Sequence, residues 1–115
     1  MNKAELEQRT KEFSLRLIRF LQSLPKNDLG EALGRQLLKS GTSIGANYRE
    51  ANRAESKADF IHKLAIAEKE ASETVYWLEL MLEAGFGTSA EIERLAQEAK
   101  ELLAILTTIG RNTKR

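Results

Sequence analysis

A lone proline and a long interval without glycine constrain this chain more than any other feature. Its only proline is Pro25, and no glycine occurs in residues 46–84. Proline and glycine are the strongest helix interrupters, and good helix formers dominate the rest of the sequence. The pattern therefore predicts long helices with few interruptions, and the predicted fold class is all-α.

Two helical segments are predicted in the first half. The first covers about residues 3–24 and ends at Pro25, because proline cannot continue the hydrogen-bond ladder. Residues 28–31 resemble a capping box with Asp28 as the N-cap, so a second helix is expected to start near Leu29.

Two glycines lie inside the second predicted helix. Gly41 and Gly45 each cost about 1 kcal/mol relative to alanine in a helix interior. Either they permit the close approach of another backbone, or the helix bends there. We favour close approach.

Two more helical segments are predicted in the second half. Ser56 is expected to cap a helix that runs to about Ala84, where Gly85 and the residues after it end it. Residues 88–91 open the fourth helix, and Gly110 is well placed as its C-terminal cap. The predicted architecture is an antiparallel, up-down-up-down four-helix bundle forming a single domain over residues 1–115, with a basic tail over residues 111–115.

The third predicted helix has a second apolar stripe beside the one expected to face the core. Glu70 and Glu73 fall in the same sector of this helix. One interpretation is a tryptophan packed along the edge of the core. We favour the other, an interface for self-assembly in which a neighbouring helix or protomer satisfies the two glutamates. The residues of this predicted interface are Ile66, Trp77, Leu80 and Met81.

The second predicted helix also has a basic sector opposite its apolar stripe. It comprises Arg35, Lys39, Arg49 and Arg53, which project within about 80° of one another. This sector is either a solvated face or a set of phosphate contacts that an oligomer would multiply. The formal net charge of the chain, +1, favours the solvated face.

The sequence lacks the residues and motifs that most kinds of catalysis require. The chain has no cysteine and a single histidine, His62, and it contains no phosphate loop, nucleophile elbow or dinucleotide fingerprint. We therefore expect neither an enzyme nor a metal or cofactor. The absence of cysteine suits a cytoplasmic protein, and no segment is apolar enough for a membrane span or signal peptide.

The centre of the sequence carries a family resemblance. Residues 40–68, and Glu73 after them, resemble the bacterial family of four helix bundle proteins, also called 23S rRNA-intervening-sequence proteins. The residues that match the family pattern are Ser43, Ile44, Asn47, Glu50, Asp59, Phe60 and Glu73.

The resemblance implies a homo-oligomer, with a pentameric ring as its form. It also implies similarity to the accessory variability determinant of diversity-generating retroelements, a basic ring that binds nucleic acid and a reverse transcriptase. Polar groups between helices can fix their register when each is hydrogen-bonded, so we interpret Asn47, Glu50 and Glu73 as an interhelical polar network.

The predicted function is a non-enzymatic, homo-oligomeric helical bundle. It is expected to bind RNA or DNA, or a nucleic-acid enzyme such as a reverse transcriptase, through its basic surfaces. The alternative is a protein–protein scaffold that binds no nucleic acid.

Overall fold

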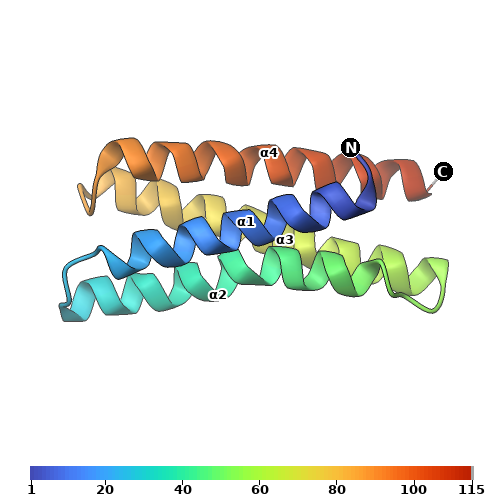
Figure 1. Ribbon diagram of the computed structural model, residues 1–115, viewed down its shortest axis with the longest axis horizontal. Helices are drawn as coiled ribbons and strands as arrows, with labels where there is room; N and C mark the ends of the chain where they lie inside the picture. Colours follow the sequence, from blue (N-terminus) through green and yellow to red (C-terminus); the bar gives the residue numbers. More distant parts are fainter. Residues whose placement is uncertain (115) are drawn as a thin grey trace.

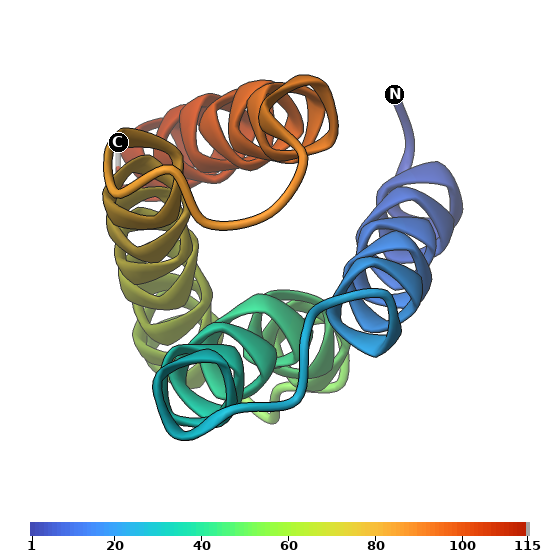
Figure 2. The same ribbon diagram turned by 90° about the vertical axis from the view of Figure 1, so that its left-hand side faces the viewer.

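The computed structural model describes residues 1–114, and four helices account for most of them. Their bounds are α1 (Lys3–Gln22), α2 (Asp28–Ala51), α3 (Lys57–Glu83) and α4 (Ser89–Lys114). Successive helices run lengthwise in opposite directions (Figure 1), and each packs against its two neighbours around a square (Figure 2). This arrangement confirms the predicted all-α, antiparallel four-helix bundle.

Side-chain caps fix where the helices begin. The Asn2 carboxamide oxygen accepts a hydrogen bond from the Glu5 N–H at 2.8 Å, and the Glu5 side chain reaches back to the Asn2 N–H. Ser56 caps α3 as predicted, by accepting from the Asp59 N–H at 3.0 Å. The prediction for α2 was wrong by one residue, because Asn27 rather than Asp28 is in the extended conformation that lets a side chain cap the first turn.

The end of α3 is a Schellman motif. Gly85 has a φ of 69°, in the left-handed region that favours glycine. Its N–H donates to the Leu82 carbonyl at 3.1 Å, and the Phe86 N–H donates to the Met81 carbonyl at 2.9 Å. The predicted stop at Gly85 is therefore confirmed.

The predicted stop at Gly110 was wrong. The helix α4 continues through Gly110 to Lys114, so residues 111–114 of the predicted tail are helical, while Arg115 lies outside the described residues. The glycine cap that we predicted requires a left-handed conformation, and Gly110 has no positive φ. It is buried, with Leu64 and Glu68 of α3 beside it.

The core lies along the bundle axis and draws on all four helices. The largest fully buried side chains are Leu6, Phe13, Leu17, Leu37, Ile44, Leu64, Leu78, Met81, Ile92, Leu95, Leu102 and Leu106. A buried hydrogen bond of 3.0 Å from the Thr74 hydroxyl to the Ser40 hydroxyl joins α3 to α2 within this core.

The two glycines within α2 permit the close approach of α1. A Cβ atom on Gly41 would collide with the Leu17 side chain, and one on Gly45 would lie 3.0 Å from the Thr10 hydroxyl. Both residues remain within α2, whose hydrogen-bonded helix spans Asp28–Ala51. Close approach, the favoured alternative, is confirmed.

None of the described helices is both long enough and apolar enough to cross a membrane.

Candidate nucleic-acid interface and assembly face

The predicted basic residues are all exposed, but they do not form one continuous helical stripe. Arg35, Lys39 and Arg49 project from α2 into solvent. Arg53 lies beyond the end of the helix at Ala51, in a turn where its N–H donates to the Glu50 carbonyl at 3.0 Å. The predicted placement of Arg53 on the helix was therefore wrong, although its side chain is exposed.

The four predicted basic residues also differ in whether an acidic side chain lies near them. Arg49 pairs with Glu7 of α1, with 3.4 Å between Nε and Oε1. Lys39 lies on the α3 side, where its charge acts to lower the pKa of Glu70. Arg35 and Arg53 make no ion pair within residues 1–114.

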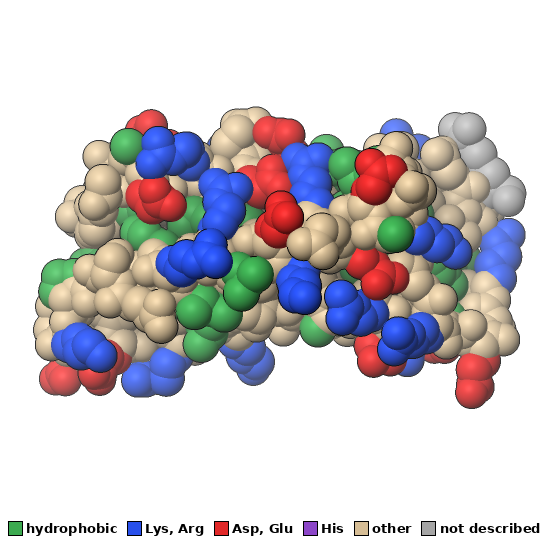
Figure 3. Space-filling view, viewed as in Figure 1, with side chains coloured by type: hydrophobic (Ala, Val, Ile, Leu, Met, Phe, Trp, Pro, Cys, Tyr) green, Lys and Arg blue, Asp and Glu red, His purple; other side chains and the backbone are tan. Residues whose placement is uncertain are grey.

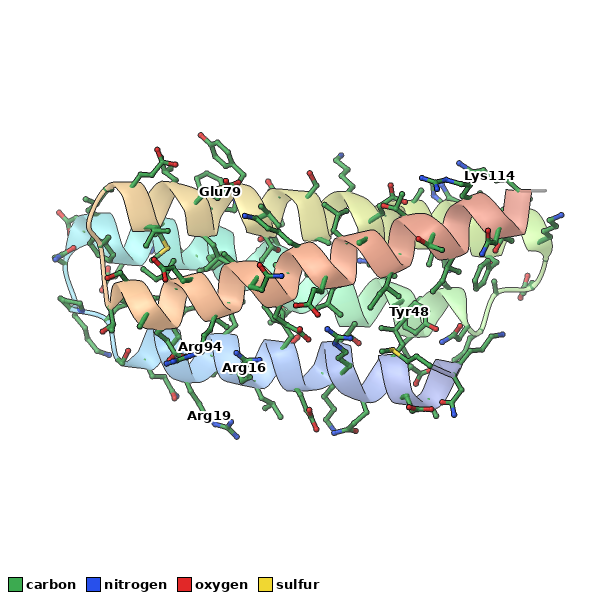
Figure 4. All side chains as sticks on the ribbon, turned by 90° about the horizontal axis from the view of Figure 1, so that it is seen from above. Arg16, Arg19, Tyr48, Glu79, Arg94 and Lys114 are labelled. Atoms are coloured by element: carbon green, nitrogen blue, oxygen red, sulfur yellow. The ribbon has the colours of Figure 1, made fainter. Side chains whose placement is uncertain are left out.

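Helix α1 adds cations to the same side of the molecule. Lys11 and Arg19 are exposed, and Figure 3, which views the molecule from the α1 side, shows Lys and Arg side chains along this face. Arg16 and Arg19 line a groove of about 440 Å³ between α1 and the start of α4. Figure 4 shows Arg94 of α4 near the two α1 arginines, and Arg94 pairs with Glu91 at 2.8 Å. We call seven cations of α1, α2 and the turn after α2 the basic hairpin surface: Lys11, Arg16, Arg19, Arg35, Lys39, Arg49 and Arg53.

Charge is segregated between the two halves of the chain. Residues 1–53, which contain α1 and α2, hold ten Lys and Arg against six Asp and Glu. Residues 54–115 hold eight Lys and Arg against eleven Asp and Glu. The net charges of +4 and −3 sum to the +1 of the whole chain, so the near-neutral total conceals two halves of the chain with opposite net charge.

The predicted interface on α3 is only partly at the surface. Leu80 is 38% exposed, whereas Ile66 and Trp77 are half-buried. Met81 is 0% exposed and belongs to the core, so its predicted place in an interface was wrong. It lies only about 60° around the helix from the buried Leu78. We call Ile66, Trp77 and Leu80 the α3 face.

Two buried polar atoms beside the α3 face have no hydrogen-bond partner in the part of the chain that the structure describes. They are the Glu70 Oε2 and the Trp77 Nε1 atoms, on residues two helical turns apart. Burial, and next the charge of Glu73, raise the pKa of Glu70, while Lys39 and Lys69 oppose that shift. Buried polar groups are nearly always hydrogen-bonded in native structures, so we expect a hydrogen-bond partner for each of the two atoms.

The comparisons with known proteins agree with this fold. The profile of the 23S rRNA-intervening sequence protein family matches residues 2–108. The chain belongs to this family. It is also similar to a solved structure of a protein of unknown function, from the S23 ribosomal protein family of Bacteroides thetaiotaomicron VPI-5482. The two are 39% identical, with a TM-score of 0.88, and the match covers 96% of this chain and 99% of the other. The comparison with curated proteins gave no match.

The three polar residues that match the family pattern are not joined by hydrogen bonds within the chain. The Asn47 carboxamide donates to the Ser43 carbonyl of its own helix at 2.8 Å. Glu50 and Glu73 are exposed, and no hydrogen bond among residues 1–114 links any two of the three. An interhelical network within one protomer was therefore the wrong interpretation, because the carboxylates of Glu50 and Glu73 project outward rather than between α2 and α3.

Sequence reasoning missed one ion-pair cluster. Arg9 of α1 binds Glu98 of α4 with two hydrogen bonds of 2.8 Å, and it reaches Glu101 at 3.0 Å. The hydrogen bond to Glu98 raises the pKa of Arg9 above its ordinary value. These residues lie about 90 positions apart, and no local pattern pairs them. Arg9 is thereby engaged within the bundle and does not extend the basic hairpin surface.

The arrangement of possible metal ligands can also be read from the structure. No group of three or more His, Asp or Glu side chains within residues 1–114 is arranged to hold a metal ion.

Proposed function

We propose that the protein is a single-domain, non-enzymatic bundle that self-associates and binds nucleic acid through the basic hairpin surface. The observation that carries this proposal is the segregation of charge, with net +4 over residues 1–53 and net −3 over the rest. Figure 3 shows several Lys and Arg side chains on the side of the molecule that α1 and α2 form, with carboxylates between them, and clustered cations are what phosphate backbones recognise.

Each contact of this surface with a phosphate is weak, and self-association supplies the affinity. Single exposed cations contribute little, but several protomers on one nucleic-acid strand would bind with avidity. Phosphate contacts position a protein without reading bases, so the expected binding has little sequence preference. The competing function is a protein–protein scaffold whose basic side chains are only solvated.

A charge-reversal pair tests the nucleic-acid proposal. In the double variant Arg19→Glu/Arg35→Glu, we expect the affinity for a labelled RNA or DNA oligonucleotide to fall by about tenfold or more at low salt. The slope of log K against log salt concentration should also become shallower by about two. Fluorescence anisotropy over a salt series measures both quantities.

The matched control is Lys57→Glu/Lys100→Glu, which changes the net charge equally on the acidic half of the chain and lies away from the α3 face. Lys57 of α3 and Lys100 of α4 are exposed and have no ion pair among the described residues. This control should retain most of the binding. Equal losses in the two double variants, or no binding by the wild type at low ionic strength, would support the scaffold instead.

A substitution on the α3 face tests self-association. Leu80→Glu should give smaller particles in analytical ultracentrifugation with unchanged helicity, because Leu80 is already 38% exposed in the single chain. A partner on this face would also supply groups to the unpaired Trp77 and Glu70 atoms. The control is Leu15→Glu on α1, whose side chain is 40% exposed and should tolerate the change. A monomeric wild type at high micromolar concentration would contradict self-association, and dissociation by Leu15→Glu alone would place the interface on α1.

A further inference from the structure

An apolar pocket opens at the end of the bundle where α1 begins. Its volume is about 660 Å³, within the range of small-molecule sites. All four helices contribute to its lining, through Leu6 of α1, Tyr48 of α2, Phe60 of α3, and Ile105 and Ile109 of α4. None of these residues belongs to the basic hairpin surface or to the α3 face.

The relative lengths of α1 and α4 explain why the pocket exists. Figure 1 shows that α4 runs beyond the point where α1 begins, because the helix continues through Gly110 to Lys114. The last buried side chain of α1 toward this end is Leu6. Ile105 and Ile109 are therefore only half-buried, and they present apolar surface that α1 does not cover.

The charged groups that line the pocket are cationic. Lys3 is the only charged side chain in the lining, and its Nζ atom lies 5.9 Å from the centroid of the Phe60 ring. No carboxylate lines the pocket, although the chain contains 17 Asp and Glu. The site thus combines an apolar floor with the positive charge of Lys3.

Tyr48 adds no negative charge to this floor. Burial raises the pKa of Tyr48, and the charge of Glu7 raises it further, while a hydrogen bond with Asn52 opposes the shift. The phenol is therefore protonated at neutral pH. Figure 4 shows Tyr48 between α1 and α4.

We propose that this pocket binds an anionic amphiphile with a single acyl chain, of the fatty-acid class. The acyl chain would cover the exposed faces of Ile105 and Ile109, and the carboxylate would lie against the Lys3 ammonium. The positive charge of Lys3 would repel a cationic amphiphile, and it would not attract a neutral alkyl chain.

The test uses laurate below its micellar concentration, with dodecanol as the uncharged comparison. Titration calorimetry of the full chain should show saturable laurate binding. Lys3→Glu should weaken laurate binding by about tenfold, while dodecanol binding stays unchanged. Lys11→Glu is the control, because it makes the same charge change on α1 away from the pocket.

A second variant blocks the pocket itself. Ala104 is exposed and lines the pocket, so Ala104→Trp should abolish laurate binding with no loss of helicity or thermal stability. Ala65→Trp, at an exposed position of α3 outside the lining, should bind laurate as the wild type does. Absence of saturable binding to the wild type, or binding that survives Ala104→Trp, would overturn the proposal. So would the finding that Ala104→Trp reduces particle size while laurate fails to bind, since a second copy would then cover the pocket.

Discussion

Replacing Gly41 by leucine should lower the free energy of unfolding by about 3 kcal/mol, the largest effect that we expect from any single substitution. Gly41 is buried where α2 approaches α1, and even a Cβ atom there would collide with the Leu17 side chain. Leu17 is 0% exposed and cannot move into solvent. The remaining three carbons of a leucine would have to separate the two helices. Urea unfolding followed by circular dichroism measures the change.

The matched control for this prediction is Gly34→Ala, in the same helix. A Cβ atom on Gly34 would lie 3.6 Å from the Leu21 side chain, an ordinary van der Waals distance. This variant should therefore gain stability of about 0.5–1 kcal/mol, since alanine has the higher helix propensity. If Gly41→Leu also gained stability, helix propensity rather than close approach would explain the role of Gly41.

The helices and most of their ends could be predicted because the responsible signals are local. The Ser56 cap and the stop at Gly85 each depend on residues within a few positions, and both are confirmed. Gly110 shows where this reasoning fails, because the same residue type can end a helix or lie buried within one. Its conformation depends on packing against α3, and the sequence around Gly110 does not contain that information.

The candidate site was harder to predict than the fold, because helical periodicity gives the direction of a side chain but not its surroundings. Lys39 and Arg49 share a helix face with Arg35, yet each lies near a carboxylate of a different helix. Met81 differs from its neighbours in the predicted interface by a small rotation, and that rotation is enough to place it in the core. The segregation of charge between hairpins could be read from the sequence, but its meaning required knowing that α1 and α2 pack side by side.

Contacts between distant helices were beyond sequence reasoning altogether. Of the four neighbouring helix pairs, α1 and α4 have the least extensive contact. The hydrogen bonds from Arg9 to Glu98 therefore make up a large part of what joins these two helices. An arginine that binds two carboxylates from the far end of the chain produces no periodic pattern in the sequence and no bias in its composition. The structure alone identifies it, and it leads to the second prediction of large effect.

Arg9→Ala should lower the free energy of unfolding by about 2 kcal/mol. Its side chain is 27% exposed and that of Glu98 is 16% exposed, so the pair is only partly screened by solvent. Removal of the guanidinium leaves the Glu98 carboxylate poorly solvated, without the two hydrogen bonds that it accepts from Arg9. Urea unfolding provides the measurement. Glu98→Gln in the Arg9→Ala background should recover part of the loss, because the unpaired charge is then absent.

Arg94 provides the control, since it pairs with Glu91 at the same 2.8 Å but with a side chain that is 65% exposed. Exposed pairs within one helix contribute little, so Arg94→Ala should change the free energy of unfolding by less than about 0.5 kcal/mol. The contrast compares a partly buried cluster that joins two helices with a single exposed pair inside one helix, at the same residue type and shortest distance. Equal effects of Arg9→Ala and Arg94→Ala would show that the α1–α4 contact is held by apolar packing, with the ion pairs adding no stability of their own.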